Sequence, residues 1–334
     1  IRAGYGRTIN PLPWSRPMRG AYPYDVYLSQ TGETYGWATT LAQGIPGFTL
    51  PDLSSGRVQL PVGVFTRTPE QNNVDRGIIQ QWNVAFEQRL PWDISAEIAY
   101  VGTATDGGYA DLNINYGQPG GGIAARQYFA IAGTTTVNSW GSRLKSRYKG
   151  LQLALNRPFR NGLMLKGAYT LSEAKNMADE DGWQGLTWNH PIKYDDNFAL
   201  AGFDRTHVAQ LGFLYELPFF KGSQGAAKAI LGGWQINGIG SWYSGTPYSI
   251  GGTNNALNCQ GCGSVFINFA GDSPEPIGGV GSGSTDTYYD KSLFSQPTGL
   301  DASGFGTSDR NQFRRPSVWN VDLSVFKSFQ VGRV

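Results

Sequence analysis

The stretch WNVAFEQRLPWDISAEIAYVG, residues 82–102, carries an apolar residue at almost every second position on each side of a turn at residues 90–93. The apolar residues are Trp82, Val84, Phe86, Ile94, Ala96, Ile98 and Tyr100, and the polar residues between them include Asn83, Glu87, Ser95 and Glu97. Successive side chains of a β-strand point to opposite faces, so this pattern predicts a hairpin with one apolar and one polar face. The apolar face could cover a protein core, with water on the other side. Alternatively, it could contact lipid around a polar interior.

The composition leaves both interpretations open. Charged residues make up 16% of the 334 residues, below the roughly 25% of soluble domains. The net charge of +2 gives no indication of a nucleic-acid partner. No apolar run approaches the ~20 residues of a membrane helix, whereas a membrane strand needs only alternation. The chain begins at Ile1 without a signal-peptide pattern, so we expect that a targeting signal has been removed or that the chain is part of a longer protein.

Alternation of this kind predicts eight strands and no long helix. They are expected at Ile1–Thr8, Ile78–Gln88, Ile94–Thr103, Tyr148–Asn156, Leu163–Leu171, Thr206–Leu217, Gly233–Ser244 and Ser317–Phe329. Short connections alternate with long loops at about 9–77, 104–147, 172–205 and 245–316. Aromatic residues gather near the strand ends, as they do at a bilayer interface.

This arrangement is typical of an up-and-down outer-membrane barrel, with short turns at one end and long loops at the other. We therefore predict an all-β chain forming a partial antiparallel transmembrane β-barrel of about eight strands, with residues 1–334 as one barrel domain. The following residues are expected to face lipid: Trp82, Val84, Phe86, Leu151, Leu153, Leu155, Val321, Leu323 and Val325.

Five stretches, in this order, resemble one protein family. They are IQQWNVAFEQRLPWDISAEIAYVGT, YKGLQLALNRPFRNGLMLKGAYTLSEAKN, FDRTHVAQLGFLYELPFFKG, GGWQINGIGSWYSGTPYSI and RNQFRRPSVWNVDLSVFKSF. They resemble the C-terminal half of the barrel in TonB-dependent outer-membrane receptors, in the Oar-like subgroup that carries a carboxypeptidase-regulatory-like domain. The plug, the TonB box and the last hairpin of that family are not in this chain, which therefore looks like part of a receptor.

The resemblance implies a receptor that captures a ligand at the surface of a Gram-negative cell and imports it with energy from the inner-membrane proton gradient. It implies no enzyme activity, contact with outer-membrane lipid, and engagement of TonB through the N-terminal part. A small molecule, an oligosaccharide and a peptide all remain open as the ligand. Two other classes stay open as alternatives, namely a passive porin or structural barrel protein and a secreted lectin-like β-sandwich.

Cys259 and Cys262 form a Cys-x-x-Cys pair in the last long loop. A zinc site needs two further ligands, and His190 and His207 are the only histidines. A redox motif expects a thioredoxin-like βαβ setting, which the strand pattern does not offer. An outward-facing loop lies in an oxidising compartment, so we expect a disulfide that staples the loop. A Ser/His/Asp site that includes Asp204 and His207 would be expected with a G-x-S-x-G elbow, which we do not find, and the family resemblance implies that this stretch is a strand start with a polar network.

The loop at 172–205 combines carboxylates with aromatic rings. Asp179, Glu180 and Asp181 could bind Ca²⁺, although the spacing is not that of an EF-hand, and a solvated acidic loop is the alternative. No other cofactor or metal is expected. The rings proposed to contact the ligand are Trp183, Trp188, Tyr194 and Tyr248, because rings offer large contact area at little entropic cost. The competing interpretation is that they pack the loops together. The glycine-rich residues 117–122 are interpreted as a flexible loop.

Overall fold

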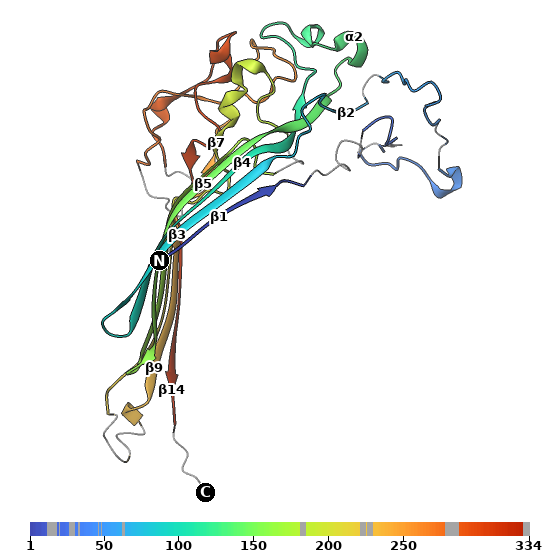
Figure 1. Ribbon diagram of the computed structural model, residues 1–334. Helices are drawn as coiled ribbons and strands as arrows, with labels where there is room; N and C mark the ends of the chain where they lie inside the picture. Colours follow the sequence, from blue (N-terminus) through green and yellow to red (C-terminus); the bar gives the residue numbers. More distant parts are fainter. Residues whose placement is uncertain are drawn as a thin grey trace.

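The computed structural model (Figure 1) describes residues 1–11, 19, 21–26, 31–32, 34–45, 47, 49–61, 64–180, 185–220, 225, 230–277 and 287–329. Within these residues, helices are short, and none has the length and apolar character needed to cross a membrane. They are η1 (Leu41–Gln43), η2 (Ile123–Ala125), α2 (Phe129–Ala132), η3 (Pro191–Lys193), η4 (Asp195–Asn197), η5 (Lys291–Leu293) and η6 (Ala302–Phe305).

One curved antiparallel sheet dominates the molecule (Figure 1). Its strands, in spatial order, are β1 (Arg2–Ile9), β3 (Ile78–Leu90), β4 (Ile94–Asn113), β5 (Val137–Arg160), β6 (Leu163–Asn176), β8 (His207–Glu216), β9 (Trp234–Tyr243) and β14 (Val318–Lys327). Sequential strands are neighbours throughout, which confirms the predicted up-and-down order. Strands β1 and β14 form the two edges, so within the described residues the sheet is an open barrel wall.

Additional short strands lie at the end of this sheet that is uppermost in Figure 1. Strand β2 (Thr66–Pro69) runs parallel to β5, and β7 (Ala199–Leu200) pairs with the end of β6. Two further pairs lie in the last long loop. They are β10 (Pro247–Tyr248) with β13 (Phe313–Arg314), and β11 (Asn268–Phe269) with β12 (Phe294–Ser295).

The register puts all nine residues predicted to face lipid on the same side of the sheet. Directly paired residues of antiparallel strands share a face. One such row runs across seven strands through Phe86, Ile98, Leu153, Tyr169, Ala209, Trp242 and Trp319. We call this side the apolar face. Seven of the nine residues have between 39% and 66% of their surface exposed, as lipid-facing residues require.

The opposite side, the polar face, carries Asn83, Glu97, Gln152, Gln210 and Asn320 in neighbouring rows. Near one end, Glu87 and Glu97 are directly opposite each other on β3 and β4, and Arg2 from β1 forms ion pairs with both. Like charges in a cross-strand pair repel each other, so the shared guanidinium stabilises this part of the wall.

The apolar face is a band of similar width on different strands. On β9 its limits are Trp242 and Trp234, and on β5 they are Lys149 and Arg157, so both pairs are eight positions apart. At ~3.3 Å per residue each interval measures roughly 26 Å along the strand. Rings mark the outer limit, where His207 stacks on Trp242 with centroids 5.8 Å apart and shares a 2.7 Å hydrogen bond with the Tyr169 hydroxyl. Such rings suit a membrane interface.

The strands cross this band at an angle that the register reveals. Trp242 pairs with Ala209, and through Tyr169 the same row reaches Leu153 on β5, four positions from Lys149. The outer limit of the band is Trp242 on β9 and Lys149 on β5, which is four residues beyond the row of Trp242. Four residues measure about 13 Å along the strand, and the three steps from β9 through β8 and β6 to β5 measure about 14 Å across the sheet. This corresponds to a tilt of roughly 40°, within the range of membrane barrels. The tilt reduces the band to roughly 20 Å along the membrane normal, which suits a thin bilayer.

Five strands end within two residues of their predicted bounds, whereas β4, β5 and β6 are longer. The predicted loop 104–147 is therefore too long, because β4 continues to Asn113 and β5 begins at Val137. The loop at 172–205 likewise begins only after Asn176. A bulge at Gly107 (φ 82°) separates the extension of β4 from the membrane part. Beyond it protein packs on both sides, so the apolar–polar alternation that reveals a membrane strand disappears.

Candidate ligand-binding site in the outer loops

The extended ends of β4 and β5 support a compact loop lobe, which we define as the described residues within 107–144, 177–206 and 245–316 (Figure 1). On one side of these strands Tyr109 stacks on Trp140, with ring centroids 4.6 Å apart. On the same side Arg67 holds Asp111 in a buried bidentate ion pair with N–O distances of 2.8 Å. On the other side Ala110 packs on Leu186. The strands thus anchor loops that come from distant parts of the chain.

Trp188 lies in the core of the lobe and not on its surface. Its ring is fully buried against Phe266 at 4.9 Å, and its Nε1 donates to the Ser264 carbonyl at 2.8 Å. Leu257 and Phe305 complete this core. Trp188 therefore offers no surface to a ligand in this conformation, so its predicted role as a ligand contact has no support from the structure. The competing interpretation, that the ring packs the loops together, describes it.

Arg310 joins the two loops that contain most of the lobe. Its side chain is buried and donates to the carbonyl of Asn197 at 3.2 Å and to Oδ1 of Asn176 at 2.6 Å. Its Nη1 lies 3.7 Å from the carboxylate of Asp179. Removing this guanidinium would leave buried acceptors without a donor, which is costly. The lobe is thus held together by a central cation.

The same contacts determine the position of Asp179, which was considered for a Ca²⁺ site. Its Oδ1 accepts hydrogen bonds from Asn176 and from the Gly202 amide, both at 3.0 Å. These donors occupy Oδ1 in this structure, and binding of Ca²⁺ at this loop stays a prediction. Glu180 lies beside it in the exposed turn, and Asp181 falls outside the described residues. Among the described residues no cluster of His, Cys, Asp or Glu could hold a metal ion.

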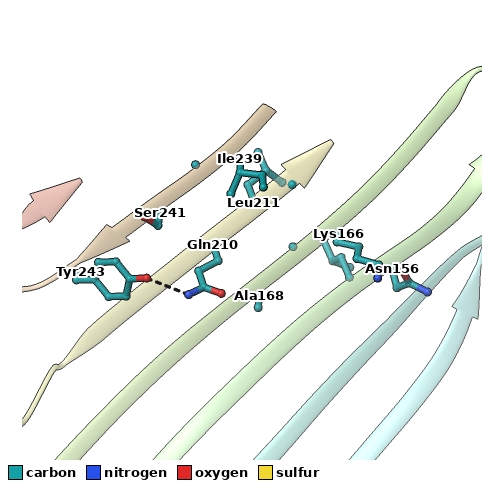
Figure 2. A pocket seen from close by; sticks show the side chains of 12 residues that line it. Asn156, Lys166, Ala168, Gln210, Leu211, Ile239, Ser241 and Tyr243 are labelled. Atoms are coloured by element: carbon teal, nitrogen blue, oxygen red, sulfur yellow. Dashed lines mark hydrogen bonds between the residues drawn. The ribbon is translucent and has the colours of Figure 1, made fainter. Parts of the chain in front are cut away.

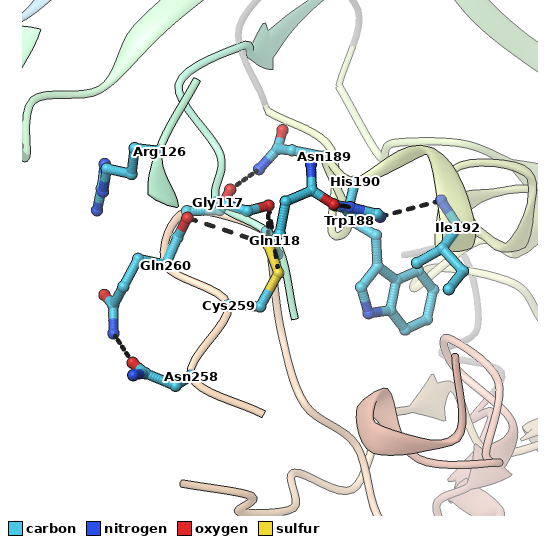
Figure 3. The surroundings of a disulfide bond; sticks show 12 residues. Gly117, Gln118, Arg126, Trp188, Asn189, His190, Ile192, Asn258, Cys259 and Gln260 are labelled. Carbon is cyan, nitrogen blue, oxygen red and sulfur yellow. Dashed lines mark hydrogen bonds between the residues drawn. A yellow bond between two sulfur atoms is a disulfide. The ribbon is translucent and has the colours of Figure 1, made fainter. Parts of the chain in front are cut away.

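A disulfide joins Cys259 to Cys262, whose Cα atoms are 5.6 Å apart (Figure 3). The glycine-rich residues 117–122 lie along this disulfide loop, and the amides of Gly117 and Gly122 donate to the carbonyls of Gln260 and Asn258. The interpretation of 117–122 as a flexible loop is therefore wrong. Backbone pairing to the stapled segment fixes its path.

A hollow of about 310 Å³ opens between this fixed segment, the outer end of β4 and the helices η3 and η4. The residues that line it are Leu112, Ile114, Tyr116, Gln127, Tyr128, Asn189, Pro191, Tyr194 and Asp195. The described residues that line it include three tyrosines and three side chains with a carboxamide or carboxylate group, and none of these described residues is basic. We call this the tyrosine hollow.

His190 stabilises the wall of the tyrosine hollow through hydrogen bonds and a ring contact. Its Nδ1 accepts from the Ile192 amide at 3.2 Å, so its Nε2 carries the proton and donates to Gln118 Oε1 at 3.4 Å (Figure 3). Its ring also meets Tyr116 edge to face at 5.1 Å. Burial lowers the pKa of His190, which keeps the ring neutral. Burial likewise raises the pKa of Tyr194, whose hydroxyl stays protonated.

The structure does not bring the four predicted contact rings together. Tyr194 lines the hollow and Trp188 is in the core. Tyr248 belongs to a separate aromatic group, where its ring lies 6.1 Å from Phe313 and the Arg315 guanidinium covers it at 5.4 Å. Trp183 falls outside the described residues.

Of the nine lining residues only Tyr194 was predicted as a ligand contact, and Tyr116, Gln127 and Tyr128 are among the eight that the sequence did not indicate. They flank the glycine-rich residues 117–122, in the segment YGQPGGGIAARQY. A tyrosine at each end of a glycine-rich segment could have drawn attention to it. Nothing in the spacing indicates that the segment folds back, which brings the Gln127 amide to the Tyr116 carbonyl at 3.0 Å.

The start of β8 shows the polar network expected there. The carboxylate of Asp204 accepts from the Ala174 amide at 2.6 Å and from Arg314 at 2.5 Å. The His207 amide donates to the Ser244 hydroxyl at 3.0 Å. These contacts fix the end of the strand and link it to the last long loop.

Two further hollows lie on the polar face of the sheet. One, of about 540 Å³, includes Lys166, Gln210 and Tyr243 in its lining, and the Gln210 amide donates to the Tyr243 hydroxyl at 3.0 Å (Figure 2). The other, of about 660 Å³, includes Arg2 and Glu97. Both linings mix polar and apolar side chains, and their polar groups lie on the side of the sheet that we assign to the interior.

A family model agrees with this architecture. The family model described as outer membrane beta barrel domain matches residues 1–334. No curated protein matches the chain. Among solved structures, the outer membrane transporter YddB from Escherichia coli is similar over 75% of this chain, with 10% sequence identity and a TM-score of 0.38. This chain spans 26% of the length of that one.

Proposed function

The chain belongs to the outer membrane beta barrel domain family, and from this premise we propose that it is part of a TonB-dependent receptor that imports a ligand. Its place is the outer membrane of a Gram-negative cell, with the apolar face against lipid. That location removes the secreted β-sandwich from consideration. The proposal includes no enzyme activity: the protein captures its ligand, and energy reaches it through TonB.

The observation that carries the proposal is the ordered loop lobe with its tyrosine hollow at the outer end of a barrel wall. A pore that only sieves solutes needs no such lobe, whereas a receptor needs a rigid scaffold that presents recognition loops. The five stretches that resemble TonB-dependent receptors extend through the same wall. A passive porin or a structural barrel protein is the alternative.

The lining of the tyrosine hollow favours an uncharged ligand with many hydroxyl or amide groups, such as an oligosaccharide or a peptide. Rings of Tyr116 and Tyr128 offer flat apolar surface, and Gln127 and Asp195 offer polar groups. An anionic ligand would find no basic side chain in this lining. At about 310 Å³ the hollow accepts one or two rings or residues of a longer ligand.

Matched ring substitutions in the full-length protein test the site. Tyr128 is partly exposed at the hollow, so Tyr128→Ala should weaken binding by roughly tenfold or more while barely changing stability. Trp188→Ala instead should destabilise the lobe by roughly 3–5 kcal/mol. Binding would be measured against mixtures of neutral oligosaccharides and of peptides, with bound species identified by mass spectrometry. Unchanged affinity in Tyr128→Ala would place the site elsewhere.

Energy dependence separates the receptor from the passive channel. Cells that express the full-length protein should accumulate a ligand found in this way only when TonB and the proton gradient are intact. Uptake that continues in a strain without TonB, or after a protonophore, would favour the passive channel and refute the receptor.

A further inference from the structure

Four basic side chains gather on the apolar face at and just beyond its outer limit. Lys145, Arg147 and Lys149 occupy alternate positions of β5, and Lys175 of β6 pairs directly with Arg147. Leu151, the first lipid-facing residue of β5, follows Lys149 by two positions. All four side chains therefore project from the side that contacts lipid further along the strand. We call them the basic patch.

The described strand residues that point to the polar face at the same level are uncharged, and Asn176 on β6 completes their row as the partner of Ser146. Ser146 and Tyr148 alternate with the basic residues of β5, and their partners are Thr105 and Thr103 on β4 and Ala174 on β6. A strand end that is merely solvated would have reason to be charged on both faces. Among the described side chains of these strands, the positive charge is confined to the membrane side, while Arg310 on the other side is buried in the loop lobe.

Neighbouring carboxylates balance only part of this charge. Arg147 pairs with Asp106 at 2.7 Å, while Lys149 and Lys175 share Glu173 at 3.0 and 3.6 Å. The side chains of Lys149, Arg147 and Lys175 remain 62%, 43% and 41% exposed. Four cations face two carboxylates, so the basic patch retains two positive charges for an external anion.

We propose that the basic patch binds the phosphate groups of an anionic lipid in the outer leaflet. At a tilt of roughly 40°, Arg147 lies about 5 Å and Lys145 about 10 Å outside the level of Lys149. The headgroup layer of one leaflet is roughly 5–8 Å thick, so long side chains reach it from these positions. Guanidinium and ammonium groups are the natural donors to phosphate oxygens. This inference needs only the membrane location and not the proposed receptor function.

Native mass spectrometry of the full-length protein in mild detergent tests the proposal. The probes are diphosphoryl lipid A and the same glycolipid without phosphates. The triple variant Lys145→Gln, Arg147→Gln, Lys149→Gln should bind the diphosphoryl form more weakly, by about fivefold for each charge removed. Lys166→Gln, which removes a lysine from the polar face, is the matched control and should bind as the natural protein does.

Several outcomes would overturn the proposal. They are equal affinity of the triple variant and the control, equal binding of the dephosphorylated glycolipid, and displacement of the lipid by millimolar inorganic phosphate. The last would indicate a site for soluble phosphate. If the triple variant fails to fold, the single variant Lys145→Gln replaces it and should bind diphosphoryl lipid A about fivefold more weakly than the natural protein. This substitution should leave the fold intact, because Lys145 forms no ion pair with any described residue.

Discussion

Leu153→Arg is the sharpest test of which face meets lipid. Leu153 lies four positions from Lys149 and four from Arg157, at the centre of the apolar band on β5. Its cross-strand neighbours are Ile98 and Tyr169, and its side chain is partly exposed on the apolar face. An arginine at the bilayer midplane of a barrel costs roughly 2–4 kcal/mol. We expect a loss of this size in the free energy of unfolding.

Gln152 provides the matched control because it is adjacent in the chain and points to the polar face, where it pairs with Ala99 and Thr170. Gln152→Arg should cost less than about 1 kcal/mol, as for an exposed polar site. Leu153→Ala separately measures the packing lost with the leucine. Subtracting that loss leaves the cost of placing the charge in lipid.

The assay is reversible urea unfolding of the full-length protein from phospholipid vesicles, followed by tryptophan fluorescence. Each variant is compared with the natural protein at the same lipid ratio, and a common slope against urea is required before midpoints are converted into free energies. Equal losses for Leu153→Arg and Gln152→Arg would refute the assignment of the two faces. A larger loss for Gln152→Arg would reverse it.

Two further predictions concern the loop lobe. Mass spectrometry of protein that has never met reductant should find the peptide with Cys259 and Cys262 about 2 Da lighter than its reduced form. Replacing both cysteines by serine should cost the lobe roughly 2 kcal/mol and expose residues 117–122 to protease, with the barrel unchanged; two freely alkylated thiols would contradict the pairing. Because burial lowers the pKa of His190, the unfolded lobe binds more protons than the folded lobe below about pH 6.5, so stability is complete above that pH and is lost as pH falls. The protection factors of the amides around η3, which are corrected for the slower intrinsic exchange at lower pH, should therefore fall as the pH drops below about 6.5, and His190→Asn should remove this dependence; an identical response in the variant would assign it to another group.

Much of the barrel wall could be predicted from the sequence, because lipid acts uniformly on every strand it touches. Wherever one side of a strand meets hydrocarbon and the other a polar interior, the requirement repeats every second residue. Val321, Leu323 and Val325 therefore revealed the orientation of β14 without any knowledge of its neighbour. The tilt of the strands could not be predicted in this way, because it follows from the pairing register, which places Trp242 in the same row as Leu153.

The loop lobe could not be predicted in this way, because its environment differs from residue to residue. The ends of β4 and β5 are covered by protein on both sides, so their sequence lost the alternation that marks a strand. Trp188 and Tyr194 are six positions apart and are both aromatic residues with one polar group, yet one is in the core and the other lines a hollow. Only tertiary contacts decide which ring is buried in the core and which lines the hollow. The sequence by itself determined which side of β3, β5 and β14 meets lipid, because alternation is local, and the folding of distant segments onto β4 decided where the tyrosine hollow lies.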